Sequence, residues 1–270
     1  MPRPSTLFCS LMICLISACT GSKQLLNTNS QTIISWRSPE GMRRLAESNY
    51  KIDFFTLANH FESQNNKLFC GPASAAIVLN ALRIRHNSNI KIPQDPTLLS
   101  SADLRFFSSK TWSPLFARYT QNNIFINSPK SRALVLGKIQ RNQQGEPQRD
   151  RGFQIRQLAD LLLQHGLSVK TGIVTPTLTN KKIKQDLLRN LKHPDDYVII
   201  NYKRGILGQA GGGHISPVAA YHQASDSFLI MDVTPNKADW IWVKSALLFS
   251  AMRTFDTVEN RGYLLVSEDQ

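Results

Sequence analysis

The first two thirds of the chain are patterned mainly for helices. Residues 73–82 are small or apolar at almost every position, which predicts a helix buried nearly all round. Apolar residues recur at helical spacing across 155–162, and Gly166 supplies a stop just beyond them. The segment 183–191 repeats this amphipathic pattern, and residues 54–60 predict a further short helix.

The final third changes to a pattern of strands. Short runs of β-branched and aromatic residues alternate with turn-forming residues, as expected for antiparallel neighbours. Helices followed by such a sheet predict an α+β fold, in which a helical part packs against an antiparallel sheet. No internal repeat, phosphate-binding glycine motif or zinc-binding motif occurs, so nucleotide and metal sites lack support. The expected strands are 197–202, 215–221, 228–233 and 262–266.

The N-terminus indicates an exported protein. Arg3 precedes an apolar run, 7–16, that is too short to span a bilayer and is followed by small residues. Ile16-Ser17-Ala18-Cys19 resembles the lipobox of bacterial lipoproteins, in which the cysteine is lipidated and begins the mature protein. The expected parts are a lipoprotein signal peptide at 1–18, a polar tether at 19–40 and one folded domain at 41–270.

Cysteine usage then leaves a single thiol. Cys9 and Cys14 lie in the expected signal and Cys19 is expected to carry lipid, so Cys70 is the remaining cysteine of the four. An unpaired cysteine in an exported protein is either buried and inert or chemically used. Because Thr20 rather than aspartate follows the lipidated residue, we expect an exported lipoprotein on the periplasm-facing side of a membrane, the outer one in a diderm host.

Composition and charge narrow the partners. Hydrophobic residues make up 41% and charged residues 19%, the balance of a globular protein. The formal charge of +13 is spread along the chain without the interleaved aromatic residues of a nucleic-acid-binding surface. We therefore expect no nucleic-acid partner, and a positive field that favours an anionic substrate.

Cys70 lies where a thiol would be activated. It opens the predicted buried helix, and Gly71 and Pro72 suit the close approach and the first turn of such a helix. The positive end of the helix would lower the pKa of the thiol. Gln64 lies six residues earlier, the spacing at which papain-like enzymes place an oxyanion-hole amide. A cysteine that merely packs in the core is the alternative, and Gln64 shifts the balance towards a nucleophile.

His214 best fits the base among the six histidines. It follows three glycines, 211–213, and opens an expected strand. If Val218 pairs with Phe228, His214 lies directly opposite Asp232, with Cβ atoms roughly 5 Å apart. A carboxylate at that distance would hold the imidazole tautomer, whereas the alternative is a strand-ending aspartate that faces water.

These segments resemble the catalytic region of phytochelatin synthases. The resemblance extends from about Tyr50 to Val266. It implies a papain-like fold, with the helical part carrying the cysteine and the sheet carrying the histidine and aspartate. It also places Cys70, His214 and Asp232 on the family triad and Gln64 on its oxyanion residue, and it assigns contacts with the acyl dipeptide to Asn201, Arg204 and Arg261. The segments that carry it are 64–82, 201–204, 212–217, 231–233, 242–243 and 261–262.

The resemblance implies a reaction of glutathione. Its Cys–Gly bond would be attacked to release glycine and leave a γ-glutamylcysteinyl thioester, which passes to water or to another glutathione. No cofactor or bound metal is expected, and heavy-metal ions such as cadmium or zinc would enter as thiolate complexes with glutathione. The cysteine-rich C-terminal region of plant relatives does not follow, and reduced glutathione would be scarcer in an exported setting. We therefore expect mainly hydrolysis at low glutathione.

Two other functions compete with this expectation. A double-glycine leader peptidase likewise combines glutamine, a Cys-Gly start and a His…Asp pair, but the segments around His214 and Arg261 argue against it. A catalytically silent lipoprotein that binds thiol peptides is the second. Neither the oligomeric state nor the host is indicated.

Overall fold

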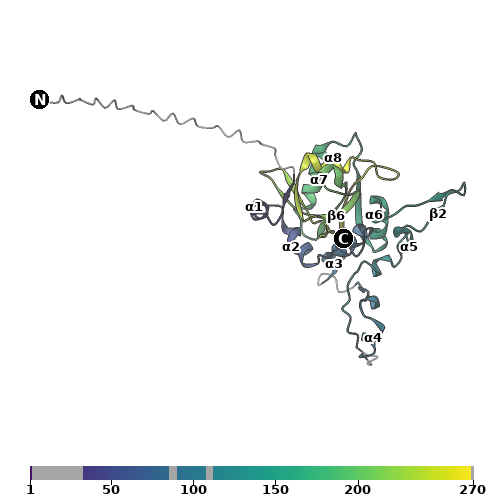
Figure 1. Cartoon of the computed structure of the whole chain (residues 1–270). Helices are drawn as coiled ribbons and strands as arrows, with labels where there is room; N and C mark the ends of the chain where they lie inside the picture. Colours follow the sequence, from purple (N-terminus) through teal and green to yellow (C-terminus); the bar gives the residue numbers. More distant parts are fainter. Residues whose placement is uncertain (2–32, 85–89, 108–111, 269–270) are drawn as a thin grey trace. The chain divides into compact units, whose positions relative to one another are not determined.

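The computed structural model describes residues 33–84, 90–107 and 112–268, together with Met1. The chain divides into two units, 1–31 and 32–270, and all described secondary structure lies in the second (Figure 1). Apart from Met1, the expected signal peptide, Cys19 and the tether up to residue 32 lie outside the described residues. Among those described, no helix is long and apolar enough to cross a membrane.

A seven-stranded antiparallel sheet organises the described chain. Its edge strand β1 falls within the expected tether at 19–40, so the sheet starts before the expected domain boundary. In sheet order the strands are β1 (Ile33–Ser35), β8 (Ile241–Lys244), β7 (Ser227–Ile230), β6 (Gly213–His222), β5 (Asp196–Lys203), β9 (Gly262–Glu268) and β4 (Leu167–Ile173). β2 (Gln140–Arg141) and β3 (Pro147–Gln148) form a separate hairpin.

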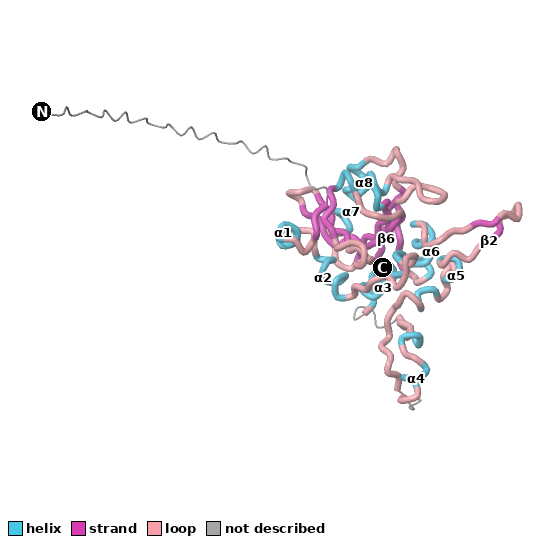
Figure 2. Tube along the Cα trace, viewed as in Figure 1, coloured by secondary structure: helices cyan, strands magenta, loops and turns pink. Residues whose placement is uncertain are grey.

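Helices cover both faces of the sheet (Figure 2). The α-helices of the described residues are α1 (Pro39–Glu47), α2 (Ile52–Asn59), α3 (Cys70–Arg83), α4 (Ser101–Leu104), α5 (Arg132–Val135), α6 (Ile155–Gln164), α7 (Asn180–Asn190) and α8 (Ser245–Met252). Short 3-10 turns are η1 (Pro96–Leu98), η2 (Asn123–Phe125) and η3 (Arg204–Leu207).

Alternate residues of β5 belong to different cores. Ile199 packs with the apolar side chains of α2, α3 and α6, whereas Val198 and Ile200 pack with those of α7 and α8. Because successive side chains of a strand point to opposite faces, a strand covered on both faces is apolar throughout. This explains the uninterrupted run at 197–200, and the α+β class expected from the sequence agrees with the structure.

The expected register of the β6–β7 hairpin is wrong. Val218 pairs with Ile230 rather than with Phe228, and a bulge follows between Val218 and Ala220. The loop 223–226 holds four residues, and Asp226 adopts a φ of 48° to close it. Continued from Val218, this register places Asp232 diagonally across from His214 instead of directly opposite.

The fold places the beginning of α3 against the beginning of β6. Ser74, one turn into α3, directs its hydroxyl at the carbonyl oxygen of Ile215, with 3.3 Å between the two oxygens. Since Cys70 is the first residue of α3 and His214 the second of β6, this contact brings both into one site.

Candidate active site

Cys70 lies at the positive end of the most buried helix. Every residue of α3 after Cys70 is buried, while Cys70 itself is partly exposed. Phe69 occupies the N-cap without a side-chain hydrogen bond, so the amides of the first turn are left for the sulfur or a ligand. Gly71 permits close packing here, since a Cβ atom would lie 3.1 Å from the side chain of Phe153.

His214 connects the thiol to a buried carboxylate. Its Nε2 lies 2.9 Å from Oδ1 of Asp232, and the imidazole also forms a hydrogen bond with Cys70. Because Nε2 is engaged by the carboxylate, Nδ1 is the nitrogen that faces the sulfur. The ring of Tyr202, its partner across the strand pair, meets the imidazole edge-on at 5.7 Å and fixes its plane.

Asp232 is fully buried and held by four groups. Besides His214, it accepts hydrogen bonds from the Tyr202 hydroxyl at 3.2 Å, the Thr234 amide at 2.8 Å and the Arg204 guanidinium. The closest Arg204 contact is 2.6 Å. Burial alone would raise the pKa of Asp232, but the hydrogen bond and charge of His214, the charge of Arg204 and the Thr234 amide lower it. This carboxylate is therefore ionised and fixed in place.

The thiol and the imidazole shift one another towards a charged pair. Burial would raise the pKa of Cys70, yet the hydrogen bond and charge of His214 and contacts with the backbone of Ile215 and Gly71 lower it. Burial would likewise lower the pKa of His214, but Asp232 and Cys70 raise it. These opposite shifts favour thiolate and imidazolium, the form in which a cysteine is a nucleophile.

Two hollows meet at His214. The first, the Cys70 hollow, has a volume of about 160 Å³ and includes Cys70, Phe153 and Asn201 in its lining. The second, the Gln64 hollow, has a volume of about 280 Å³ and includes Gln64 and Arg204. Both are lined by Lys67, Gly213 and His214, so a bound molecule could extend past the histidine from one hollow into the other.

Gln64 lies in the second hollow with its amide held from both ends. Its Nε2 donates to the Asn66 carbonyl oxygen at 2.6 Å, and its Oε1 accepts from the Thr234 hydroxyl at 2.7 Å. Its backbone amide donates to the carbonyl oxygen of Val233 at 2.8 Å. These bonds use one N–H of the side-chain amide, Gln64 lines the same hollow as His214, and the segment that carries Asp232 also fixes Gln64.

A polar cluster borders the Cys70 hollow, with Asn201 and Asp256 in its lining and Arg261 beside them. Asp256 accepts from Asn201 Nδ2 at 2.9 Å and from Arg261 Nη2 at 2.7 Å. Asn201 Oδ1 and Arg261 Nε are buried and have no hydrogen-bond partner among the described residues. Arg261 also restricts which residue can precede His214. A Cβ atom at Gly213 would lie 2.7 Å from Nη2 of this arginine.

The two arginines expected to contact substrate therefore occupy different settings. Arg204 is 3% exposed and pairs with Asp232, although it also borders the Gln64 hollow. Arg261 is 6% exposed and lies with Asn201 and Asp256. Sequence reasoning gave no role to Asp256, a lone aspartate in a loop, or to Tyr202. Both residues contact the site through partners that are distant in the sequence, and local spacing does not indicate such contacts.

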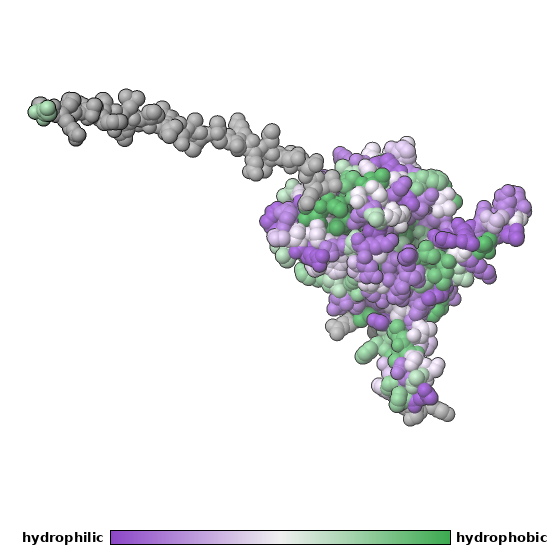
Figure 3. All heavy atoms as spheres, in the orientation of Figure 1, coloured by the Kyte–Doolittle hydropathy of each residue, from purple (hydrophilic) through white to green (hydrophobic). Residues whose placement is uncertain are grey.

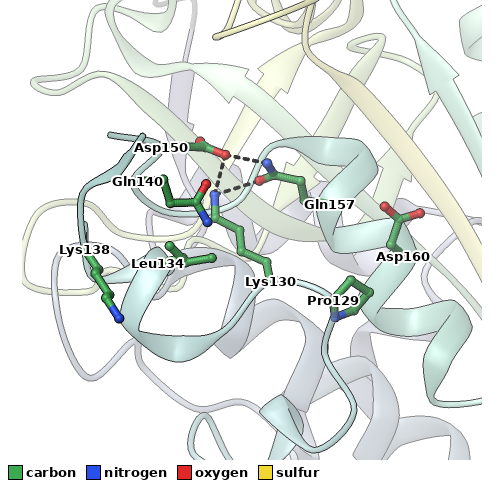
Figure 4. A pocket seen from close by; sticks show the side chains of 8 residues that line it. All are labelled: Pro129, Lys130, Leu134, Lys138, Gln140, Asp150, Gln157 and Asp160. Atoms are coloured by element: carbon green, nitrogen blue, oxygen red, sulfur yellow. Dashed lines mark hydrogen bonds and ion pairs between the residues drawn. The ribbon is translucent and has the colours of Figure 1, made fainter. Parts of the chain in front are cut away.

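A further hollow of about 220 Å³ is lined by Lys130, Asp150 and Gln157, among others (Figure 4). In it the Lys130 ammonium, on a side chain 8% exposed, lies 2.7 Å from Asp150 and 2.9 Å from Gln157. Burial lowers the pKa of Lys130 and outweighs the opposing effect of Asp150. Among the described residues, no cysteine or histidine lines this hollow, and Asp150 directly precedes the segment 151–153 that borders Cys70. We interpret the ion pair between Lys130 and Asp150 as a support for the segment 151–153.

Within the part of the chain that the structure describes, no group of three or more His, Cys, Asp or Glu side chains could hold a metal ion. The site contains a thiol, an imidazole and hydrogen-bonding groups. Such an arrangement can attack a carbonyl carbon and form a covalent acyl intermediate.

The chain is similar to one family of known proteins. A model of the phytochelatin synthase family matches residues 25–95 and 98–263, which is most of the chain. Both hollows and all the residues of the cysteine–histidine–aspartate arrangement lie within these ranges.

Similar curated proteins bear one name. Glutathione gamma-glutamylcysteinyltransferase 3 of Lotus japonicus is 26% identical over 88% of this chain and 43% of its own length. Glutathione gamma-glutamylcysteinyltransferase 1 of Triticum aestivum is 28% identical over 88% and 41%. The Schizosaccharomyces pombe enzyme of that name is 24% identical over 83% and 45%. The chain therefore spans less than half the length of these relatives.

Proposed function

The chain belongs to the phytochelatin synthase family, and we propose that it cleaves the Cys–Gly bond of glutathione through a thioester on Cys70. Glycine would leave, and the γ-glutamylcysteinyl group would pass to water or to a second glutathione. We further propose a papain-like arrangement, in which the helix carries the nucleophile and the sheet carries its base. The observation that carries the proposal is the continuous chain of contacts from Cys70 through His214 to Asp232.

We propose a first half-reaction that uses this geometry. The Cys70 thiolate attacks the cysteinyl carbonyl carbon, and the electron pair of the C=O bond moves onto oxygen. As the intermediate collapses, the C–N bond to glycine breaks and the His214 imidazolium gives its Nδ1 proton to the departing amine. Asp232 holds the imidazole through Nε2 and takes no proton itself.

The second half-reaction reverses these roles. His214, now neutral, removes a proton from the incoming water or amine, which attacks the thioester carbonyl carbon. The Cys70 sulfur leaves as thiolate, and the proton taken by the imidazole restores the charged pair. The Cys70 backbone N–H and the Gln64 amide would stabilise the oxyanion in both halves, each such donor contributing about 2.7–4 kcal/mol in a comparable site.

The polar cluster suits the γ-glutamyl end of the substrate. That end carries both an α-ammonium and an α-carboxylate, and the cluster offers both a carboxylate and a guanidinium. Arg261 Nε can donate to the carboxylate, and Asn201 Oδ1 together with Asp256 can accept from the ammonium. Arg261 Nε and Asn201 Oδ1 are available for this because neither has a hydrogen-bond partner among the described residues. The acyl group would then fill the Cys70 hollow.

The Gln64 hollow would receive the leaving glycine and afterwards the acceptor. This hollow adjoins the Cys70 hollow at His214, the residue that would exchange the proton. Lys67 and Lys237, both exposed, line it and can attract the carboxylates of a second glutathione. Water needs no such attraction. The balance between hydrolysis and transfer would therefore depend on glutathione concentration, with hydrolysis dominant when it is low.

We also retain the proposal that the chain is an exported lipoprotein, lipidated at Cys19 and held on a periplasm-facing membrane. Two or more acyl chains would hold it stably, whereas one is marginal. Intact-mass analysis of native protein tests this: cleavage before Cys19 with added acyl mass supports it, and an unmodified Met1 terminus contradicts it.

Incubation with glutathione and mass spectrometry of the products tests the reaction. We expect glycine with γ-glutamylcysteine, joined by short phytochelatins at high glutathione or with thiol-binding metals. Cleavage of double-glycine leader peptides instead would reassign the enzyme. If neither substrate is cleaved and iodoacetamide labels Cys70 no faster than a free thiol at mildly acidic pH, the silent binding protein is the better account.

A further inference from the structure

Residues 90–107 and 112–118 form an arm that extends away from the sheet (Figure 1). Its two legs are joined by a hydrogen bond from the Arg118 amide to the Pro93 carbonyl oxygen at 3.0 Å. A second, from Gln94 Nε2 to the carbonyl oxygen of Leu115, measures 2.7 Å. The arm thus has a defined course, and α4 lies near its end.

The base of the arm is fixed by a buried carboxylate. Asp95 is 2% exposed and accepts hydrogen bonds from the Thr97 hydroxyl at 2.6 Å and the Thr120 hydroxyl at 2.5 Å. Asp95 therefore joins the first leg of the arm to Thr120, just beyond the end of the second leg at Arg118.

Large apolar side chains are exposed along this arm (Figure 3). Phe116 is 87% exposed, Phe106 84% and Trp112 60%, and the rings of Phe107 and Trp112 lie 5.7 Å apart. A large exposed apolar patch of this kind is typical of a surface that binds a membrane or another protein. The exposed set is Leu98, Leu104, Phe106, Phe107, Trp112 and Phe116.

The exposed charge on the arm is mainly positive. Lys91, Arg105 and Arg118 are exposed, against one exposed carboxylate, Asp103, in the described residues of the arm. Asp103 is itself engaged by Ser100 in a capping box at the start of α4. The arm therefore combines aromatic and aliphatic side chains with cations, on a protein whose formal charge is +13.

We propose that this arm contacts the surface of an anionic lipid bilayer. Tryptophan and phenylalanine favour the boundary between headgroups and acyl chains, and basic side chains are attracted to anionic headgroups. A protein partner would need a complementary acidic and apolar groove, for which this chain offers no indication. The contact would turn the unit towards the membrane independently of any lipid at Cys19.

Quenching of Trp112 fluorescence by brominated lipids tests the contact. The assay uses the full chain with Cys19→Ser, so that no lipid is added, and vesicles of brominated phosphatidylglycerol or brominated phosphatidylcholine. Trp112 is the exposed tryptophan of the four in the chain, and Trp112→Phe isolates its signal. The N-terminal apolar run is common to all variants, so differences between them report the arm.

We expect quenching with phosphatidylglycerol that weakens with salt and with phosphatidylcholine. Phe116→Ser should reduce the partition coefficient on the order of tenfold, because a phenylalanine side chain is lost from the apolar phase. Phe55→Ser, which removes a ring 62% exposed on α2, is the matched control and should change nothing. Lys91→Glu with Arg105→Glu should weaken binding more than Lys181→Glu with Lys192→Glu.

Thermal unfolding midpoints establish that each variant is folded. Absence of Trp112 quenching in folded protein would overturn the proposal, as would equal losses in Phe116→Ser and Phe55→Ser. Sedimentation showing a dimer that Phe116→Ser dissociates would assign the arm to a second copy of this chain and likewise overturn it.

Discussion

Two buried carboxylates in this molecule have opposite surroundings. Asp232 is fully buried and receives hydrogen bonds from Arg204, Tyr202, Thr234 and His214, and its pKa is lowered. Asp53, on α2, is 2% exposed, and neither of its carboxylate oxygens has a hydrogen-bond partner among the described residues.

Asp53 is consequently neutral in the folded protein. Burial raises its pKa to about 9, and the charges of Asp196 and Asp195 add to the rise. Burial and Asp195 also raise the pKa of Asp196, to about 7. The first turn of a helix favours a negative charge, but that effect is smaller than the cost of removing an unpaired charge from water.

The comparison shows that burial alone does not make a catalytic carboxylate. Both groups have strongly perturbed surroundings, yet only Asp232 has donors that hold it ionised and an imidazole to orient. The Asp53 region carries a stability cost that depends on pH, whereas the Asp232 region carries chemistry. Activity, stability and the pH dependence of stability should separate the two regions.

The largest difference should be in activity. Cys70→Ala should abolish glycine release, and His214→Ala should approach the same loss, because the nucleophile or its proton carrier is gone. Asp53→Asn should leave kcat/KM for glutathione within about twofold, since it touches neither hollow. Glycine release by folded Cys70→Ala at the parent rate would contradict the mechanism.

Removal of Arg204 should come next, and it should affect stability. Loss of one partner from a buried ion pair costs about 3–5 kcal/mol, because the other charge is left buried. Chemical denaturation of Arg204→Ala checks this, with Arg189→Ala, an arginine whose side chain is 69% exposed, as the control. Equal stability of both variants would mean that Asp232 does not depend on this arginine.

The pH dependence of stability should distinguish Asp53. Its pKa is higher folded than unfolded, so the folded protein binds a proton that the unfolded chain releases above about pH 4. Stability should fall as pH rises from about 4 towards 9. Asp53→Asn should flatten this fall and gain a few kcal/mol at pH 8, since each pKa unit corresponds to about 1.4 kcal/mol. Exposed Asp160→Asn is the control, and an unchanged slope in Asp53→Asn would contradict the assignment.

The smallest effect should concern the branch between water and glutathione. Lys237→Ala, best combined with Lys67→Ala, should lower the ratio of phytochelatin to γ-glutamylcysteine by about twofold to fivefold, as expected for exposed charges worth about 0.2–1 kcal/mol each. Glycine release at saturating glutathione should persist. Lys192 lies outside both hollows, so Lys192→Ala serves as the control. An equal product ratio in the parent, the double variant and Lys192→Ala would show that Lys67 and Lys237 do not belong to the acceptor site.

Much of this arrangement was accessible from the sequence because it is local. The buried helix after Cys70 and the strand after His214 follow from runs of mostly small or apolar residues, and the structure has both. The hairpin register was wrong because a four-residue loop and a bulge move the pairing by two residues. His214 and Asp232 still meet because β7 ends at Ile230 and the chain then bends the carboxylate back towards the imidazole.

Long-range partners could not be read in this way. Nothing near Arg204 in the sequence indicates that its guanidinium holds Asp232, 28 residues away. Asp256 meets Asn201 across 55 residues, and no periodicity marks it. The edge strand β1, three residues long, carries too weak a pattern to separate it from a polar tether.

Rapid mixing with excess glutathione, followed by acid quenching and peptide mapping, tests the central claim most directly. We predict a rapid burst of one glycine per protein chain and a γ-glutamylcysteinyl adduct on the peptide that contains Cys70. The adduct should be absent from Cys70→Ala and should disappear as γ-glutamylcysteine or phytochelatin forms. Glycine released without a burst or adduct, and equally by folded Cys70→Ala, would contradict a thioester on this cysteine.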